Sequence, residues 1–205
     1  MTGRRPGRPR EPVPRENLLA AACRVFDRDG YGAARLADIA REAGISRGAL
    51  AYHFATKDAL YDEVLSGIAG GFHRLVAEAL SGRASWEARL DALGDASVAV
   101  LGQRPDVARL MLRELVDGGP YVAGPGGAVV DALVDAIVAF LEEGLAAGLV
   151  APQDPRHLAG TIVALHVAWF GAPALTGRLG GTAPDAVAVR SEQVRAQVRR
   201  LCGLR

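Results

Sequence analysis

The stretch that decides the fold is LADIAREAGISRGAL, residues 36–50. Ile39 and Ala40 lie on one apolar face of a short helix, and the small side chain of Ala40 lets a second helix approach closely. Gly44 can adopt the positive φ of a sharp turn, and Ser46 is a suitable N-cap for the helix that follows. Two short helices joined by a glycine-containing turn predict a helix-turn-helix, whose second helix enters the major groove of DNA.

Helical patterns continue along most of the chain. Apolar residues recur at spacings of three and four, and no stretch alternates apolar and polar residues long enough to indicate a sheet. Gly30 is placed to end the first helix in a left-handed conformation, and Thr56 to cap the fourth. We therefore expect an all-α protein with about nine helices, at about residues 14–29, 36–43, 47–53, 57–82, 85–101, 105–117, 127–147, 155–172 and 185–201.

Charge is distributed unevenly along the 205 residues. Residues 1–57 carry eleven Arg or Lys and six Asp or Glu, whereas residues 58–205 carry thirteen and seventeen. A basic end on a mildly acidic body indicates that this end meets a polyanion. Chance variation gives the same imbalance, so the charge supports the helix-turn-helix and does not stand alone.

The sequence offers little for catalysis. It contains no His-Glu-x-x-His, no phosphate loop, and no Cys or His pair at metal spacing, so we expect no enzyme, no cofactor and no metal. Cys23 and Cys202 lack a pairing pattern, which is typical of a reducing cytosol. The first fifteen residues are rich in Arg and Pro and unlike a signal peptide. No run reaches the roughly 18 apolar residues of a membrane span, so we expect a cytoplasmic protein without a membrane partner.

The wider pattern resembles the TetR family of regulators. The resemblance covers about residues 15–65 and rests on an amphipathic first helix, on Gly30-Tyr31, and on ADIAREAGISRGALAYHFATKDAL at 37–60. The rest of the chain matches only in length and helical character. The resemblance implies an N-terminal three-helix helix-turn-helix DNA-binding unit and a C-terminal helical ligand-binding and dimerisation domain. The expected divisions are a flexible basic arm at 1–13, the DNA-binding domain at 14–58 and the sensing domain at 59–205.

The resemblance also implies which residues contact DNA. Four of them lie at the groove-facing start of the recognition helix, two at its end contact phosphates, and a lysine at the start of the fourth helix contacts another phosphate. These residues are Ser46, Arg47, Gly48, Ala49, Tyr52, His53 and Lys57.

Two further DNA-facing positions depart from the family pattern. Ala51 stands where the family often has a tyrosine, so base reading relies on fewer side chains. Arg35 stands at the start of the second helix, where the family often has Ser or Thr, and offers a charge to phosphate in place of a cap. Both departures leave the operator sequence open.

One recognition helix carries few base-reading groups. A symmetric homodimer reading a palindromic operator, with half-sites about 34–36 Å apart or a multiple of that, is therefore expected. Two late helices carry small or apolar residues on one face and are the expected seam, with packing inside one subunit as the alternative. The candidate interface residues are Gly160, Ala164, Ala168, Gly171, Val187, Val194, Val198 and Leu201.

Large side chains are concentrated in the C-terminal part, although only 5 % of the chain is aromatic. A ligand cavity with a few polar groups is expected there, while core packing explains any single one of them, His166 included. The candidate pocket residues are Phe72, Met111, Leu115, Tyr121, Phe140, His166, Trp169 and Phe170.

These features predict a ligand-responsive, sequence-specific DNA-binding transcriptional regulator, a repressor released from its operator by a small apolar effector. Activation from another operator position stays open. The alternative is a helical ligand-binding or adaptor protein without specific DNA recognition. Gly7-Arg8-Pro9 in the basic arm resembles an AT-hook that reads the minor groove, and a non-specific basic tail explains it equally well.

Overall fold

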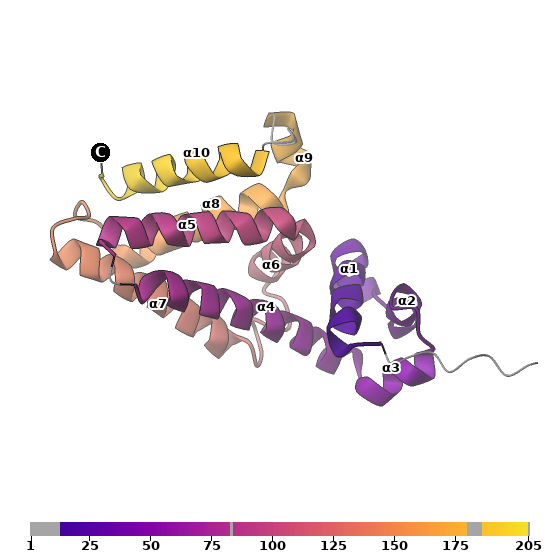
Figure 1. Cartoon of the computed structure of the whole chain (residues 1–205). Helices are drawn as coiled ribbons and strands as arrows, with labels where there is room; N and C mark the ends of the chain where they lie inside the picture. Colours follow the sequence, from indigo (N-terminus) through magenta and orange to yellow (C-terminus); the bar gives the residue numbers. More distant parts are fainter. Residues whose placement is uncertain (1–12, 83, 180–185, 205) are drawn as a thin grey trace, which may run out of the picture. The chain divides into compact units, whose positions relative to one another are not determined.

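The computed structural model describes residues 13–82, 84–179 and 186–204, without the side chains of Ala186 and Val187. Within these ranges every regular element is a helix and none is a strand (Figure 1), so the expected all-α fold is confirmed. The α-helices are α1 (Arg15–Ala33), α2 (Leu36–Glu42), α3 (Arg47–His53), α4 (Lys57–Leu80), α5 (Trp86–Gln103), α6 (Pro105–Asp117), α7 (Gly127–Ala146), α8 (Pro155–Gly171), α9 (Pro173–Thr176) and α10 (Ala186–Leu201).

The expected helices are all present, with bounds that differ by a few residues. The sequence pattern missed α9 and the 3-10 turn Gly177–Leu179 that follows it, because four residues are too few to show a period. The arm with Gly7-Arg8-Pro9 lies outside the described residues. The chain separates into two compact units, one ending at Leu60 and the other beginning at Tyr61, so the first turn of α4 belongs to the N-terminal unit.

A small apolar core holds the N-terminal unit together. Phe26 of α1 is fully buried, and Gly30 interrupts this helix with a φ of 75° and a ψ of 161°, where a left-handed end was expected. The other fully buried large side chains of this unit are Leu18, Val25, Ile39, Leu50 and Leu60. Because each of the first three helices and the first turn of α4 contributes to this core, it fixes the angle between α2 and α3.

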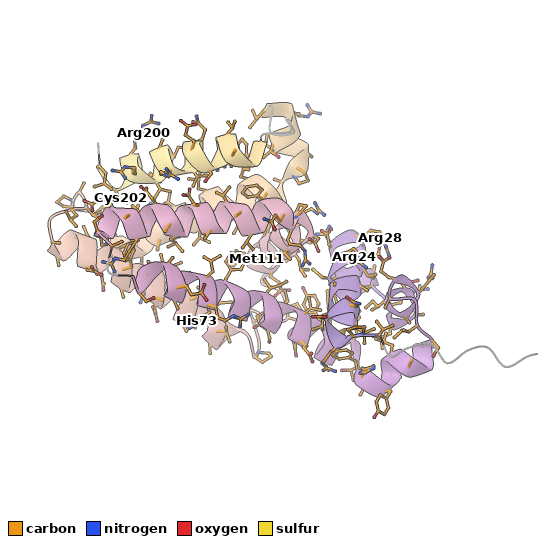
Figure 2. All side chains as sticks on the ribbon, in the orientation of Figure 1. Arg24, Arg28, His73, Met111, Arg200 and Cys202 are labelled. Carbon is orange, nitrogen blue, oxygen red and sulfur yellow. The ribbon has the colours of Figure 1, made fainter. Side chains whose placement is uncertain are left out.

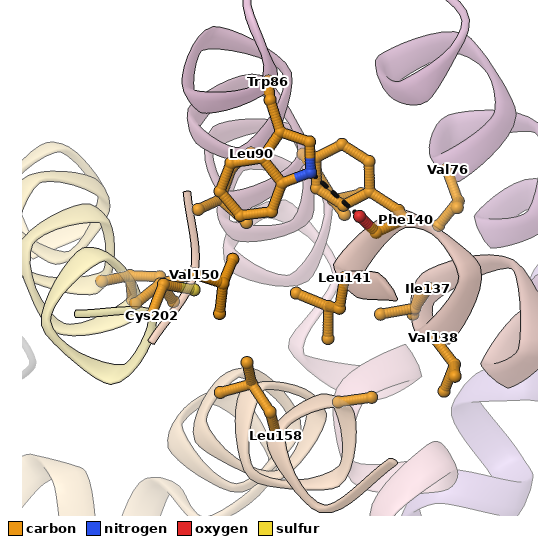
Figure 3. Packing of buried hydrophobic residues seen from close by; sticks show 14 of the residues in the cluster. Val76, Trp86, Leu90, Ile137, Val138, Phe140, Leu141, Val150, Leu158 and Cys202 are labelled. Carbon is orange, nitrogen blue, oxygen red and sulfur yellow. Dashed lines mark hydrogen bonds between the residues drawn. The ribbon is translucent and has the colours of Figure 1, made fainter. Parts of the chain in front are cut away.

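The core of the C-terminal unit is built around Trp86 and Phe140. Their rings stack with centroids 4.8 Å apart and planes at 9° (Figure 3). Trp86 Nε1–H donates a hydrogen bond of 2.9 Å to the Phe140 carbonyl, which satisfies the buried indole. Gly144, one turn further along α7, allows this contact, because a Cβ there would lie 2.6 Å from the indole ring. Val150, Leu158 and Cys202 extend the same cluster toward α8 and the end of α10.

The glycine-rich residues 118–126 form a compact turn between α6 and α7. Gly119 lies directly against the Glu114 carboxylate and Gly126 against the ring of Tyr121, where a Cβ would meet atoms at 2.0 and 2.1 Å. Glycine is needed here because two large side chains pack onto the backbone. The segment therefore closes over the interior of the unit, and Tyr121 and Val122 line one of its cavities.

No single helix in the described part of the chain combines the length and the hydrophobicity needed to cross a membrane. Pro155–Gly171 and Pro173–Leu179 meet the criterion only when counted together, and they are bent by 77° at the break between them.

Candidate nucleic-acid interface and ligand cavity

The corner between α2 and α3 has the geometry of a helix-turn-helix. Gly44 has a φ of 71°, in the region that favours glycine, and the Ile45 amide donates to the Ala40 carbonyl at 3.0 Å. Ser46 Oγ accepts a hydrogen bond of 3.1 Å from the Ala49 amide and caps α3. The turn glycine and the N-cap expected from the sequence are both confirmed.

The same corner, residues 44–48, also fits the spacing Gly-x-Ser-x-Gly of a hydrolase nucleophile. In those enzymes the serine follows a β-strand, whereas Ser46 follows α2 and its hydroxyl serves the cap. The motif is therefore a structural corner. Nor do the described residues bring three His, Cys, Asp or Glu side chains into a cluster able to hold a metal ion.

A single side chain anchors α3, and the remaining ones face outward. Leu50 is fully buried, whereas Tyr52 is 89 % exposed. The Tyr52 ring meets that of His53 edge-on, with centroids 5.5 Å apart. An aromatic ring this exposed contributes little to the fold, so it is available to another molecule. The exposed residues among the predicted DNA contacts are Arg35, Ser46, Arg47, Gly48, Ala49, Ala51, Tyr52 and His53.

Gly48 is the second residue of α3, and the packing around it does not require glycine. A Cβ at this position would lie 3.9 Å from Ser46 Oγ, which is an ordinary van der Waals contact. Glycine inside a helix costs about 1 kcal/mol relative to alanine. Since the fold has room for a methyl group, this cost is consistent with a surface that another backbone must approach closely.

Lys57 is less exposed than the other predicted contacts. Its Nζ donates to the Tyr31 carbonyl at 2.7 Å and to the Gly32 carbonyl at 3.3 Å, and it lies 4.4 Å from the centre of the Tyr31 ring. The Tyr31 hydroxyl donates to Asp58, and Thr56 caps α4 as predicted. Lys57 thus ties the end of α1 to the start of α4. An ammonium has three N–H groups, which leaves one donor, and a phosphate contact stays a prediction.

The cations of the N-terminal unit fall into two groups. Arg24 of α1 pairs with a glutamate of α2 at 2.8 Å, and Arg28 pairs with Asp29 at 2.9 Å; Figure 2 labels both arginines. The hydrogen bond from Arg28 lowers the pKa of the Asp29 carboxyl. Arg35 and Arg47 form no ion pair with any residue in the described ranges. Both therefore offer a positive charge to an external anion. Arg35 also begins α2 without a side-chain cap, as expected.

The described helices of the C-terminal unit surround two apolar cavities, with volumes of about 90 Å³ and 110 Å³. The first is lined by α4, α5, α6, α7, α8 and α10, and the second by α4, α6, α7, α8 and the turn at 118–126. Figure 2 labels Met111, which lines both cavities. The residues shared by the two cavities are Phe72, Met111, Leu133, Ile137 and Val163. Each cavity is smaller than the roughly 150 Å³ that admits benzene, so a larger molecule requires the shared side chains to move.

The structure sorts the candidate pocket residues into two groups. Those that line a cavity are Phe72, Met111, Leu115, Tyr121 and His166. The other three lie elsewhere. Phe140 stacks on Trp86, Phe170 packs against the same core, and Trp169 lies beneath the Arg190 guanidinium at 4.1 Å. Side-chain size selected all eight from the sequence, and size does not distinguish a cavity wall from a core contact.

Sequence reasoning missed Glu114, a carboxylate that is only 5 % exposed at the edge of the second cavity. It accepts a hydrogen bond of 2.5 Å from the Tyr61 hydroxyl and one of 3.2 Å from the Val122 amide. It therefore joins α4 and the turn at 118–126 to α6. A signal was present, because Glu114 lies four residues after Leu110 and seven after Val107 on the apolar face of α6.

The predicted dimer seam requires correction on α10. Val194 is completely buried and Val198 nearly so, both inside the core of a single unit. Gly171 also packs internally, against Leu112 of α6, where a Cβ would lie 3.0 Å from its side chain. Periodicity shows that a helix has an apolar face but not which surface covers it. The side chain of Val187 lies outside the described residues, and the candidates that remain exposed are Gly160, Ala164, Ala168 and Leu201.

The N-terminal unit carries a capped recognition helix, and the helical unit that follows it in the same chain contains apolar cavities. This combination defines a one-component DNA-binding regulator. The family model described as bacterial regulatory proteins, tetR family, matches residues 18–64. The HTH-type transcriptional regulator RutR of Escherichia coli strain K12 is 32 % identical over 175 residues, which cover 83 % of this chain and 80 % of RutR. The chain belongs to the TetR family of transcriptional regulators, as its sequence motif indicated.

Solved structures share the fold over most of their length. FadR of Bacillus subtilis, in complex with stearoyl-CoA, has a TM-score of 0.72 at 18 % identity, covering 89 % of this chain and 96 % of FadR. AibR, in complex with isovaleryl coenzyme A and operator DNA, also has a TM-score of 0.72, at 17 % identity, covering 93 % and 98 %. These proteins therefore share the fold although few of their residues are identical.

Proposed function

We propose that this protein is a homodimeric cytoplasmic repressor that leaves a palindromic operator when a small apolar effector enters its C-terminal unit. The observation that carries the proposal is the surface of α3. All of its side chains except Leu50 face outward, on a helix that Ser46 caps, that Leu50 anchors and that carries the unpaired Arg47. An exposed helix that carries small residues, a cation and two polar aromatic side chains is suited to the major groove of a duplex.

The roles of the DNA-facing residues follow from their chemistry. The Arg47 guanidinium can donate two hydrogen bonds to guanine O6 and N7, and the alanines beside it can contact thymine methyl groups. Tyr52 and His53 stand at the end of the helix and donate to phosphate oxygens. Arg35 and the remaining N–H of Lys57 add charge next to the backbone.

Dimerisation is assigned to the exposed face shared by α8 and α10. Gly160, Ala164 and Ala168 lie at intervals of four residues on α8, so a partner helix can approach closely. Beside them, Thr161, Leu165, Gln197, Arg200 and Leu201 line a shallow depression. Two copies joined through this face form a four-helix bundle.

The two apolar cavities are the proposed effector site. Their apolar lining is suited to a hydrocarbon-rich molecule, which enters when the side chains shared by the two cavities move. The complexes of FadR with stearoyl-CoA and of AibR with isovaleryl coenzyme A support a site inside this domain, because both proteins share its fold. The protein acts through binding at two sites rather than through catalysis.

Selection of bound duplexes from a random pool tests the proposal. We expect one palindromic sequence with half-sites about 34–36 Å apart or a multiple of that, and weaker binding as salt rises. The double variant Arg47→Ala, Tyr52→Ala should select nothing, while Glu142→Gln on the exposed side of α7 should select the same sequence. A wild-type protein without preference for any duplex, or a monomer at every concentration, overturns the proposal.

A further inference from the structure

A histidine that lines the first cavity has a buried nitrogen atom without a partner. His166 of α8 lines this cavity and is 6 % exposed. Its Nε2 is buried and has no hydrogen-bond partner among the described residues. Five such side-chain atoms occur in the described part of the chain, and only those of His166 and Tyr121 belong to cavity-lining residues. A buried polar atom left unpaired is costly to the fold, which points to a bound molecule as its partner.

The hydrogen-bonding role of this atom is fixed by the other side of the ring. His166 Nδ1 lies 2.7 Å from the Ile162 carbonyl, which can only accept, so Nδ1 carries a proton. Burial lowers the pKa of His166, and the nearby Arg190 guanidinium lowers it further, against the opposing effect of the Ile162 hydrogen bond. The ring is therefore neutral at pH 7, and Nε2 presents a lone pair.

The surroundings restrict what can satisfy that lone pair. The other residues that line the first cavity are apolar except for Ser97 of α5. The nearby Arg190 guanidinium donates instead to the Leu165 carbonyl at 3.0 Å and to Gln197 at 3.4 Å. A molecule bound here must bring its own hydrogen-bond donor and fill the remaining volume with hydrocarbon. Esters, ketones and ethers present only lone pairs, so they would leave Nε2 unpaired and facing another acceptor.

The hydrocarbon part of such a molecule can extend from the first cavity toward the second. Phe72 and Met111 separate the first cavity from the second, since both side chains line both cavities. The unbranched thioether of Met111 adopts new rotamers readily, so displacement of this side chain joins the two volumes into one elongated space.

We propose that the effector is an elongated apolar molecule with a hydroxyl group, whose O–H donates a hydrogen bond to His166 Nε2 while its chain extends past Met111 into the second cavity. This assignment rests on the proposed function, of which it names the effector class. It gives His166 a binding role rather than the ordinary packing role of a core histidine.

Three probes of equal size test the assignment by calorimetry on the full-length protein without DNA, at a pH where His166 is neutral. Octan-1-ol, 1-methoxyheptane and nonane each have the same number of non-hydrogen atoms, but only the alcohol has a donor. We expect octan-1-ol to bind about tenfold more tightly than the other two. Equal affinities for the three probes would overturn the proposal.

Variants of one helix provide the matched controls. His166→Phe should bind all three probes equally, whereas His157→Phe, at an exposed position of the same α8, should keep the tenfold preference. If His166→Phe does not fold, NMR measurement of the 15N resonance of His166 Nε2 in the wild-type protein serves as the test. That resonance should move with octan-1-ol and stay unchanged with 1-methoxyheptane, and an unchanged resonance with both contradicts the hydrogen bond.

The two proposals fail in different ways. If octan-1-ol binds selectively but does not release the selected duplex, the hydrogen bond assigned to His166 is supported and the proposed regulation by an effector is overturned. Release of the duplex by 1-methoxyheptane and nonane as readily as by the alcohol supports regulation by an apolar effector and overturns the part assigned to His166.

Discussion

The two units of this molecule place their functional side chains differently with respect to their cores. On α3 the fold depends on Leu50, while Arg47 and Tyr52 contribute almost nothing to it. In the C-terminal unit the residues that would hold an effector, such as Met111 and His166, are themselves part of the packed interior. Stability and function can therefore be separated by mutation in the first unit and are coupled in the second.

The largest effect on stability should come from Phe140, which the sequence suggested for the pocket and the structure places in the core. Phe140→Ala removes the ring that stacks on Trp86, and should lower the free energy of unfolding by about 3 to 5 kcal/mol. Urea denaturation measures this loss. The remaining folded protein should bind octan-1-ol with unchanged affinity, and a large loss of affinity with little loss of stability would place Phe140 back in the ligand site.

Tyr52→Ala should have the opposite signature. The loss of a hydrogen bond to a charged phosphate costs about 1.5 to 3 kcal/mol, or roughly 10- to 150-fold in Kd for the operator. Because the side chain is 89 % exposed, the melting temperature should stay the same. Fluorescence anisotropy with a labelled duplex measures the affinity. Tyr52→Phe should lose as much as the alanine variant if the hydroxyl is the contact, and retain full affinity if the ring is.

Gly48→Ala separates stability from function in the most direct way. Alanine should stabilise α3 by up to about 1 kcal/mol, because the position has room for a methyl group, and yet weaken operator binding if DNA approaches the helix backbone here. Gly67→Ala is the matched control, since this glycine of α4 has open space around it and should gain the same stability with no change in affinity. Unchanged operator binding by Gly48→Ala would remove the reason given for this glycine.

The smallest effect is a pH dependence of stability caused by His166. Its pKa is lowered in the folded protein, so the unfolded chain takes up more protons as the pH falls below the ordinary value of 6.5. Stability is therefore complete above this value and declines as the pH falls from there toward the lowered pKa. Thermal melting from about pH 8 to about pH 5.5 should show a shallower decline for His166→Gln than for wild type, with His157→Gln keeping the wild-type slope.

Local rules were enough for the N-terminal unit. Gly44, Ser46 and Leu50 each satisfy a requirement of backbone conformation, capping or burial that involves residues a few positions away. Such requirements are visible in a single sequence. For this reason the corner, the cap, the buried anchor and the exposed face of α3 could all be predicted.

The interior of the C-terminal unit could not be predicted in the same way. The apolar stripe of α10 was visible, but it is covered by α5 and α8, which lie earlier in the chain, and Val194 and Val198 proved to be core residues. The chemistry of Phe140 and of His166 suits either side chain to the wall of a ligand cavity or to a packed core. Only the packing of several helices decided that one ring stacks on Trp86 and that the other lines a cavity and has an unpaired nitrogen.

The sequence by itself therefore determined the helical class, the DNA-reading corner and the family, because short-range backbone and capping preferences specify them. The tertiary structure decided which apolar residues enclose space and which fill it, and which face of α8 and α10 remains uncovered. Those outcomes depend on long-range packing, in which any large side chain can fill volume and only the final arrangement of neighbours assigns it a place.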